Sequence, residues 1–535
     1  MSSIREPAGV RRSLAAAAAF AFIAVLYFLR LGAGSLWDNS EPQYAEIVKE
    51  MLRSGDWLTL HKDLQPWFIH PPLWFWTAGA SAKLFGLTEF ALRLPSAVFG
   101  VACCYATYLA AKRLYGDAAG IVAALALGAG LEFLVLSRLA VQETMLICAM
   151  TIGTFWGYFA LRDRDARALW IAAVATAAGT MVKGPVAIVV PALALLVWAA
   201  WSKRWPSFRG LPWLGAGAAY VALAGAWFAA QTVVNGPHFL MAYFGMSNVA
   251  RFLSPFENQP GPPYYYIPVI IVGFFPFVAF VPQAIAAAWR SHSDDGRLLI
   301  AASAVPFVFF SIAQTKLPNY IAIAFPVLAV MVGRTLGDTI ATRSVAPLRV
   351  SLLVLVVALI ALVTGIVAYG RLHDNAQLAA LVPSLALLAW LVVPIAVATF
   401  GAAMWWRQPW IVPIGLSLMM GAFISVVALS ILPDIEARSK PMKAMAADVM
   451  RIWRPGDRIC FDGVRQGFSL DYYTDGPPIT SVGHNVDDVP PKKYFAVRQP
   501  AVCVVSPDAY RDLITRGVRL RLVEQTPTLW LVTTR

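Results

Sequence analysis

The chain has 535 residues, of which 59% are hydrophobic and only 14% are charged, and its mean hydropathy is +0.63. An ordinary soluble protein carries about 25% charged residues, so this composition excludes that class. The apolar residues form long runs, including 14–29, 350–368 and 377–400. Such runs match the thickness of a bilayer at about 1.5 Å of rise per helical residue. We therefore expect an α-helical multi-pass membrane protein.

The net charge of +13 does not indicate a nucleic-acid-binding face. Lys and Arg residues sit in short clusters between the apolar runs, which is the pattern of cytoplasmic loops. The first run follows Arg5, Arg11 and Arg12 and has the outline of a signal peptide. No A-x-A-like cleavage site follows it, so we expect an uncleaved first helix whose N-terminus lies in the cytoplasm.

About thirteen membrane spans are predicted from the apolar runs. Their centres lie near residues 22, 101, 127, 151, 175, 192, 221, 277, 305, 327, 358, 389 and 420. From a cytoplasmic N-terminus, every even-numbered span returns the chain to the cytoplasm. The positive-inside rule requires basic return loops, and all six are basic: 112–113, 162–167, 203–209, 290–297, 334–349 and Arg407. The long loops 31–85 and 232–264 and the tail then face outward, into the periplasm of a Gram-negative cell.

The tail differs in composition from the rest of the chain. We expect a transmembrane module over residues 1–436 and a soluble periplasmic α/β domain over residues 437–535, because helix-like and strand-like segments alternate there. The predicted segments are a helix at 441–453 and strands at 458–461, 501–505 and 529–533. Cys460 and Cys503 could pair on the oxidising side of the membrane, or remain buried thiols within their apolar strands.

The first outer loop predicts an amphipathic helix. Tyr44 and the apolar residues up to Met51 recur at i, i+3, i+4 and i+7 spacing, so the helix would lie on the membrane surface. Asp38 and Glu41 stand at its start. These acids could stabilise the N-terminus together with Ser40, or they could act chemically.

Further along the loop, His70 precedes Pro71-Pro72 and a run of aromatic residues, in the order expected at a helix start near the membrane surface. Its imidazole could anchor this segment at the interface, or it could meet a phosphate group. The aromatic neighbours favour the anchor slightly.

Charged residues also recur near the predicted outer ends of spans: Arg138 with Glu143, then Lys183, then Lys316. Charges this close to the hydrocarbon are costly and are usually functional or paired. They could pair with one another, or the lysines could extend to the interface. Together they could also form a polar cleft that is open to the outside, with cations for an anionic head group and a carboxylate for proton transfer. No His, Cys and Asp cluster has metal-ligand spacing, so no cofactor is predicted, and a divalent metal is possible but not indicated by the sequence.

These residues resemble the polyprenyl-phosphate-dependent glycosyltransferases of the GT-C superfamily, above all the lipid A aminoarabinose transferases and the protein O-mannosyltransferases. The resemblance covers about residues 20–435, and the tail more loosely. The motifs stand in the family's order: Trp-Asp-x-x-Glu-Pro-x-Tyr-Ala-Glu at 37–46, Pro-Pro-Leu-x-x-Trp at 71–76, Arg-x-x-x-x-acid at 138–143, Lys-Gly-Pro at 183–185, Arg-Phe at 251–252, Pro-x-Tyr-Tyr at 263–266 and Ser-x-x-x-x-Lys-Leu-Pro-x-Tyr at 311–320.

The resemblance implies an inverting enzyme of the inner membrane that moves one sugar from an undecaprenyl-phosphate carrier to an acceptor on the outer side. The acceptor would be an envelope glycolipid such as lipid A, a polysaccharide or a protein. An acid of the first loop would take the acceptor's proton, and cations with a tyrosine would hold the leaving phosphate. The implied catalytic residues are Glu41, Asp38 and Glu143, and the implied donor-binding residues are Tyr44, His70, Arg138, Lys183, Arg251, Lys316 and Tyr320.

The chain departs from the family pattern at four positions. Ser40 stands where the family has its usual catalytic Asp, Gln43 where it has Arg, His70 where it has Lys, and Glu143 where it has Asp. A serine hydroxyl has no useful basicity near pH 7, so we expect Glu41 to act as the base, with Asp38 second.

The main alternative is a membrane protein that binds or translocates a lipid-linked sugar without transferring it. Transporters often contain internal repeats, and we find none in this sequence. The predicted acids and cations instead concentrate in one outer cleft, which favours the enzyme.

Overall fold

The computed structural model describes residues 8–36, 40–254, 259–372, 376–434, 442–464, 467, 469–474, 476–483 and 488–535. The chain divides into two compact units. The first unit comprises the residues up to Leu31, Phe68–Trp74 and Arg93–Val427. The second comprises Gly32–Trp67, Phe75–Leu92 and the chain from Ala428 onward. Most of the first outer loop is thus grouped with the tail, whereas the sequence places this loop in the transmembrane module.

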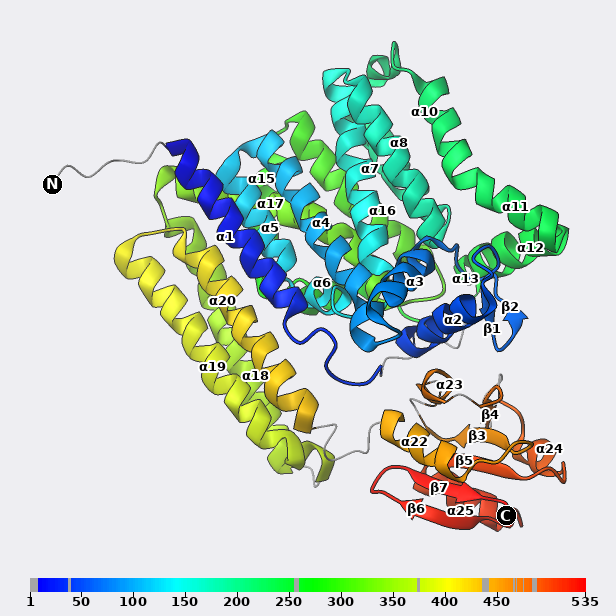
Figure 1. The fold of residues 1–535 in the computed structure, drawn as a ribbon. Coiled ribbons are helices and arrows are strands. Elements are labelled where there is room, and N and C mark those ends of the chain that lie inside the picture. Colours follow the sequence, from blue (N-terminus) through cyan, green and yellow to red (C-terminus); the bar gives the residue numbers. More distant parts are fainter. Residues whose placement is uncertain are drawn as a thin grey trace. The chain divides into compact units, whose positions relative to one another are not determined.

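The first unit is helical throughout (Figure 1). Short 3₁₀ or π segments join several of its α-helices, among them η2 (Val221–Gly225), η4 (Phe277–Phe280) and η5 (Pro318–Ala324). The α-helices are α1 (Ala8–Phe28), α4 (Glu89–Tyr115, whose first residues belong to the second unit), α5 (Asp117–Gly128), α6 (Leu131–Leu136), α7 (Glu143–Asp163), α8 (Ala166–Lys183), α9 (Val186–Trp201), α10 (Trp213–Tyr220), α11 (Ala226–Asn235), α12 (Pro237–Leu240), α13 (Arg251–Leu253), α14 (Tyr266–Gly273), α15 (Val281–Arg290), α16 (Asp294–Ile312), α17 (Phe325–Thr342), α18 (Arg349–Leu372), α19 (Ala376–Trp406) and α20 (Ile411–Val426).

Every predicted span centre lies within one of these helical segments. Eight helices of the described chain are long and apolar enough to cross a membrane, or nine if Tyr266–Gly273 and Phe277–Arg290, which bend by 111°, count as one span. Three shorter apolar helices, Arg12–Phe28, Asp117–Gly128 and Val186–Trp201, add to these. The chain is therefore a helical multi-pass membrane protein, as the composition predicts.

The helices of the first unit pack through small residues and broad apolar faces. Helix α7 packs on α8 and α9, α17 packs on α5, and α19 packs on both α18 and α20 (Figure 1). Gly333 and Gly337 of α17 meet the backbone of α5 at Ala119. A Cβ atom at Gly333 would come within 2.5 Å of the Ala119 carbonyl oxygen, so only glycine permits this approach.

The part of the first outer loop that belongs to the second unit is ordered around α2 (Ser40–Ser54). The hairpin of β1 (His61–Lys62) and β2 (Gln65–Pro66) follows it, and α3 (Leu73–Phe85) closes the loop. The predicted amphipathic helix is confirmed, and its position on the membrane surface stays a prediction. Its polar residues Glu46 and Lys49 are buried, because the tail packs against them.

The tail forms a five-stranded mixed sheet in the order β4-β3-β5-β7-β6. Strand β3 is parallel to β4 and β5, and β7 is antiparallel to β5 and β6. The elements are α22 (Met442–Ile452), β3 (Arg458–Asp462), α23 (Ser469–Tyr473), β4 (Thr480–Val482), α24 (Pro491–Phe495), β5 (Ala501–Val505), α25 (Pro507–Thr515), β6 (Arg521–Gln525) and β7 (Trp530–Thr533). The helix and the three strands predicted in the tail are all present.

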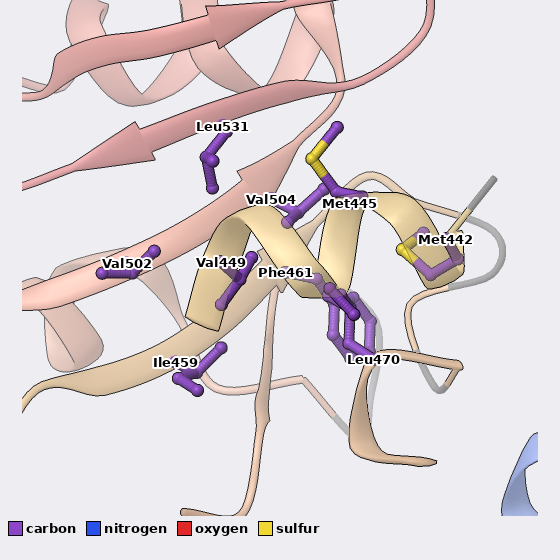
Figure 2. Packing of buried hydrophobic residues seen from close by; sticks show 10 residues of the cluster. Met442, Met445, Val449, Ile459, Phe461, Leu470, Val502, Val504 and Leu531 are labelled. Atoms are coloured by element: carbon purple, nitrogen blue, oxygen red, sulfur yellow. The ribbon is translucent and has the colours of Figure 1, made fainter. Parts of the chain in front are cut away.

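Two apolar layers cover this sheet, because successive strand residues point to opposite faces. Figure 2 shows one layer, in which Met445 and Val449 of α22 pack toward Phe461, Val502 and their neighbours. Cys460 and Cys503 belong to the other layer, where they are partners across β3 and β5 and form a disulfide. The sequence leaves open whether these cysteines pair or remain buried thiols, and in the structure they pair.

Candidate active site

A cavity of about 450 Å³ opens within the first unit. Most of its wall is apolar, with aromatic residues from three segments. A small group of polar residues gathers in the remaining wall: His70, Glu143, Lys183, Thr315, Asn319 and Tyr320. The apolar wall consists of Ile69, Leu146, Ile147, Pro185, Val186, Val189, Phe244, Phe252, Leu253, Phe309, Phe310, Ala313 and Ile323. Four of the predicted site residues, His70, Glu143, Lys183 and Tyr320, thus line one cavity.

Glu143 is the centre of the polar group. Its Oε1 accepts hydrogen bonds from Lys183 Nζ at 2.8 Å and from Asn319 Nδ2 at 2.7 Å. Its side chain is almost fully buried, and no described residue gives Oε2 a hydrogen-bond partner. A buried carboxylate oxygen without a partner is costly unless a ligand satisfies it. Glu143 can therefore accept a further hydrogen bond from a molecule in the cavity.

The ends of two helices place these charges. Glu143 is the first residue of α7 and Lys183 is the last residue of α8, where a carboxylate and a cation each oppose the helix dipole. Gly184 then adopts a φ of 87°, which favours glycine, and Pro185 leads into α9. The Lys-Gly-Pro motif is therefore a tight turn that presents Lys183 to the cavity.

His70 and Tyr320 complete the polar group. Tyr320 lies in η5, and the Lys183 ammonium sits 5.6 Å from the centre of its ring, within the range of a cation–π contact. Its ring also packs on Phe310, with centroids 5.3 Å apart. His70 precedes the two prolines before α3 and is buried at 8% exposure. Such a wall, apolar for most of its extent with a cation at one place, suits an amphipathic ligand that has an anionic head group.

Arg138 holds the end of a helix and does not line the cavity. Its guanidinium donates to the carbonyl oxygens of Leu26, Tyr27 and Leu29 at 2.6, 3.1 and 2.7 Å. These carbonyls belong to the last turn of α1 and to the residue that follows it, where a cation satisfies free acceptors and opposes the dipole.

Lys316 likewise bonds the backbone carbonyl oxygens at the end of α16. Its buried ammonium donates to the carbonyl oxygens of Phe310 at 3.0 Å, Ser311 at 2.7 Å and Ala313. Burial lowers the pKa of this ammonium below its usual range. Lys316 is not among the residues of the cavity wall, although Thr315 and Asn319 on either side of it are.

Substitution of Lys316 should therefore affect stability directly. In Lys316→Met, buried carbonyls of α16 lose their donor, and we expect a loss of about 1–3 kcal/mol in the free energy of unfolding. Thermal unfolding in detergent would measure it, with Arg407→Met, which removes an exposed cation between α19 and α20, as the matched control. Unchanged stability combined with lost donor binding would show that Lys316 serves the ligand instead of the helix.

The other predicted residues lie elsewhere or outside the described part of the chain. Glu41 and Tyr44 belong to α2 in the second unit, where Glu41 is fully buried and Tyr44 meets the ring of Phe75 edge-on at 5.4 Å. Asp38 lies outside the described residues. Arg251 begins α13, and its side chain also lies outside the described part.

Sequence reasoning missed Asn319 and Thr315 as cavity residues. Asn319 holds the same carboxylate oxygen as Lys183. The signal was present, because both residues fall inside the motif at 311–320 that supplied Lys316 and Tyr320. Among the described residues, no three His, Cys, Asp or Glu side chains are grouped to hold a metal ion.

Known proteins resemble this chain over most of its length. The profile of the dolichyl-phosphate-mannose-protein mannosyltransferase family matches residues 69–228. The undecaprenyl phosphate-α-4-amino-4-deoxy-L-arabinose arabinosyl transferase of Erwinia tasmaniensis is 30% identical over 423 residues, which are 75% of this chain and 75% of that protein. A protein of the same name, numbered 2, from Sodalis glossinidius is 30% identical over 426 residues, with the same shares of 75%.

The fold has a counterpart among solved structures. The crystal structure of ArnT from Cupriavidus metallidurans bound to undecaprenyl phosphate aligns with a TM-score of 0.83 at 22% identity, over 99% of both chains. The fold and these matches together define a GT-C glycosyltransferase, the class that the sequence motifs resemble. The chain belongs to the family of the undecaprenyl phosphate-α-4-amino-4-deoxy-L-arabinose arabinosyl transferases.

Proposed function

We propose that this glycosyltransferase moves a sugar from an undecaprenyl-phosphate carrier to an envelope glycolipid such as lipid A, on the periplasmic face of the inner membrane. A polysaccharide or a protein is the less favoured acceptor. The observation that carries the proposal is the division of the cavity wall in the first unit. Aromatic and aliphatic residues suit a polyprenyl chain, and Lys183 with His70 and Tyr320 suits the phosphate at its head.

The reaction follows from this placement of charge. The acceptor oxygen attacks the anomeric carbon of the sugar while the bond from that carbon to the phosphate oxygen breaks. The carrier phosphate leaves with the electron pair, and its growing negative charge is stabilised by the Lys183 ammonium and by donors from His70 and Tyr320. The acceptor's proton passes to a carboxylate of the first outer loop, with Glu41 proposed as the base and Asp38 second. Attack opposite the leaving group inverts the anomeric carbon.

Glu143 fits this scheme as a partner of both the cation and the substrate. Its Oε1 fixes the Lys183 ammonium in the cavity. Its Oε2 remains available to accept a hydrogen bond from a hydroxyl or amino group of the transferred sugar. The departures at Ser40, Gln43 and His70 have two explanations, a donor or acceptor that differs from those of the family's other members, or an activity that is altered or lost. We propose the first.

A transfer assay tests the proposal. Purified protein would be incubated with radiolabelled undecaprenyl-phosphate sugars and with envelope lipids, and label would be followed into the lipid fraction. We expect transfer to glycolipid with release of undecaprenyl phosphate. Binding of the carrier without transfer to any glycolipid, polysaccharide or protein acceptor would contradict the proposed function.

We further propose thirteen spans, with the N-terminus in the cytoplasm and the tail in the periplasm. The basic return loops support this arrangement, and so does the disulfide between Cys460 and Cys503, because such bonds persist in oxidising compartments. A phosphatase reporter fused after Arg535 should be active, and the same reporter fused after Arg209 should be inactive. From a cytoplasmic N-terminus, an inactive reporter after Arg535 would mean that the number of spans is even.

A further inference from the structure

We propose that the tail domain positions helix α2, which carries the proposed base, and that Lys49 is the main positioning residue. The inference rests on the proposed function, because it concerns the alignment of Glu41 for the transfer step. All of the contacts that carry it lie within the second unit.

The first contact is a buried ammonium group. Lys49 is 4% exposed, and its Nζ donates to the carbonyl oxygens of Asp471, Tyr472 and Thr474 at 2.7, 3.1 and 3.2 Å. These carbonyls form the C-terminal end of α23, where a cation is favoured by the free acceptors and the dipole. The Glu46 carboxylate lies 2.5 Å from the same ammonium and balances its charge. The ammonium therefore joins α2 to the tail in one defined geometry.

The second contact fixes the chain just before α2. Leu36 N donates to Tyr473 Oη at 2.8 Å, and Ser469 Oγ donates to Leu36 O at 2.9 Å. Both ends of α23 are thus bonded to the backbone of one residue, four positions before the start of α2. Leu36 and Lys49 lie on either side of Glu41 in the sequence, so α23 holds the chain on both sides of the proposed base.

The third contact fixes the chain just after the first outer loop, at the start of α4. Tyr472 Oη donates to Leu87 O at 3.2 Å, and Tyr473 Oη donates to the Glu89 carboxylate at 3.0 Å. Lys443 of α22 reaches the same carboxylate at 2.8 Å. A five-residue helix of the tail therefore bonds three separate segments of the second unit: the chain before α2, α2 itself and the start of α4. Buried networks of this kind fix one arrangement, because each unpaired member would be costly.

Loss of the Lys49 contact should affect catalysis more than substrate binding. Glu41 lies two helical turns before Lys49 on the same helix, so a shift of α2 at Lys49 moves the carboxylate with it. A displacement of about 1 Å of a reacting group can lower a rate about 100-fold. The donor cavity consists of residues of the first unit, so loss of the Lys49 contact should leave donor binding intact.

The experiment compares four full-length variants in detergent. Lys49→Met removes the ammonium and keeps the side-chain length, Lys49→Arg restores a multiple donor, and Tyr473→Phe removes only the phenol. Arg451→Met is the control, because this exposed cation of α22 pairs with Asp448 on its own helix. The readouts are kcat, the KM for the donor, and amide hydrogen exchange over residues 40–54.

For Lys49→Met we expect a fall in kcat of about 10- to 100-fold with an unchanged donor KM and faster exchange in α2. Lys49→Arg should recover most of the rate, Tyr473→Phe should show a smaller loss of the same kind, and Arg451→Met should resemble the wild type. Normal kcat in folded Lys49→Met overturns the inference. If Lys49→Met does not fold, normal kcat and normal exchange in Tyr473→Phe overturn it instead. Wild-type protein that transfers no sugar overturns the proposed function, while the exchange measurement still decides whether the tail holds α2.

Discussion

Lys183→Met should lower the rate of sugar transfer by about 100- to 1,000-fold, because the cation that faces the leaving phosphate is lost as negative charge grows there. Lys183 is the cation of the cavity wall that the Lys-Gly-Pro turn presents, and its ammonium is held at 2.8 Å from Glu143. Steady-state kinetics with a radiolabelled donor would measure the loss. A fall in kcat that exceeds the rise in the donor KM is expected, since the charge is greater in the transition state than in the bound donor.

Lost activity in Lys183→Met alone could have two causes, and a second substitution separates them. Loss of Lys183 leaves the buried Glu143 carboxylate without its charged partner, which could disturb the cavity by itself. The double variant Lys183→Met with Glu143→Gln removes both charges, and Asn319 can still bond the amide. We expect the double variant to recover stability and to stay inactive. Recovery of activity in the double variant would contradict a direct role for Lys183 in phosphate binding.

The helices of this protein could be predicted because their signals are local. Each span centre depends on an apolar run, and the tail strands depend on short β-branched runs, so neither needs long-range information. The pairing of Cys460 with Cys503 could not be decided in this way. It depends on β3 and β5 being neighbours in register, which no local pattern specifies.

The candidate site was predicted only in part, because its sequence signal is also local. Charges at the ends of spans are unusual, and this singled out Glu143 and Lys183, which do share the cavity. The same signal singled out Arg138 and Lys316, whose donors are occupied by the carbonyls of α1 and α16. A cation near a span end has the same appearance in sequence whether it binds a ligand or a helix terminus, so the sequence could not separate the two groups.

The partners of the polar face of α2 could not be predicted either, because they are distant in the sequence. Periodicity placed Glu46 and Lys49 away from the apolar face, where water or lipid head groups would normally meet them. Lys49 instead bonds the carbonyl oxygens at the end of α23, more than four hundred residues later, and Glu46 pairs with Lys49. Both side chains are buried. Burial raises the pKa of Glu46 to about 7.

Glu41→Gln should nearly abolish transfer and leave the donor KM unchanged, because the acceptor hydroxyl must lose its proton to a carboxylate within about 3 Å. Ser40, at the family's usual acidic position, cannot serve as a base. Glu41 follows it directly, in the first turn of α2, and is fully buried. We expect a loss of about 100-fold or more in kcat, since proton transfer by a placed side chain contributes about 10²–10⁴-fold.

The matched control is Glu50→Gln, which neutralises another carboxylate of α2, one that accepts a hydrogen bond from Leu64 N at 3.2 Å. It should transfer sugar at close to the normal rate. Ser40→Asp in the Glu41→Gln background places a carboxylate at the family's usual position and should restore part of the rate. Full activity of Glu41→Gln with an inactive Asp38→Asn would move the base to Asp38. Normal transfer by both variants would mean that the first-loop acids serve only the helix start, and that the proton leaves by another group.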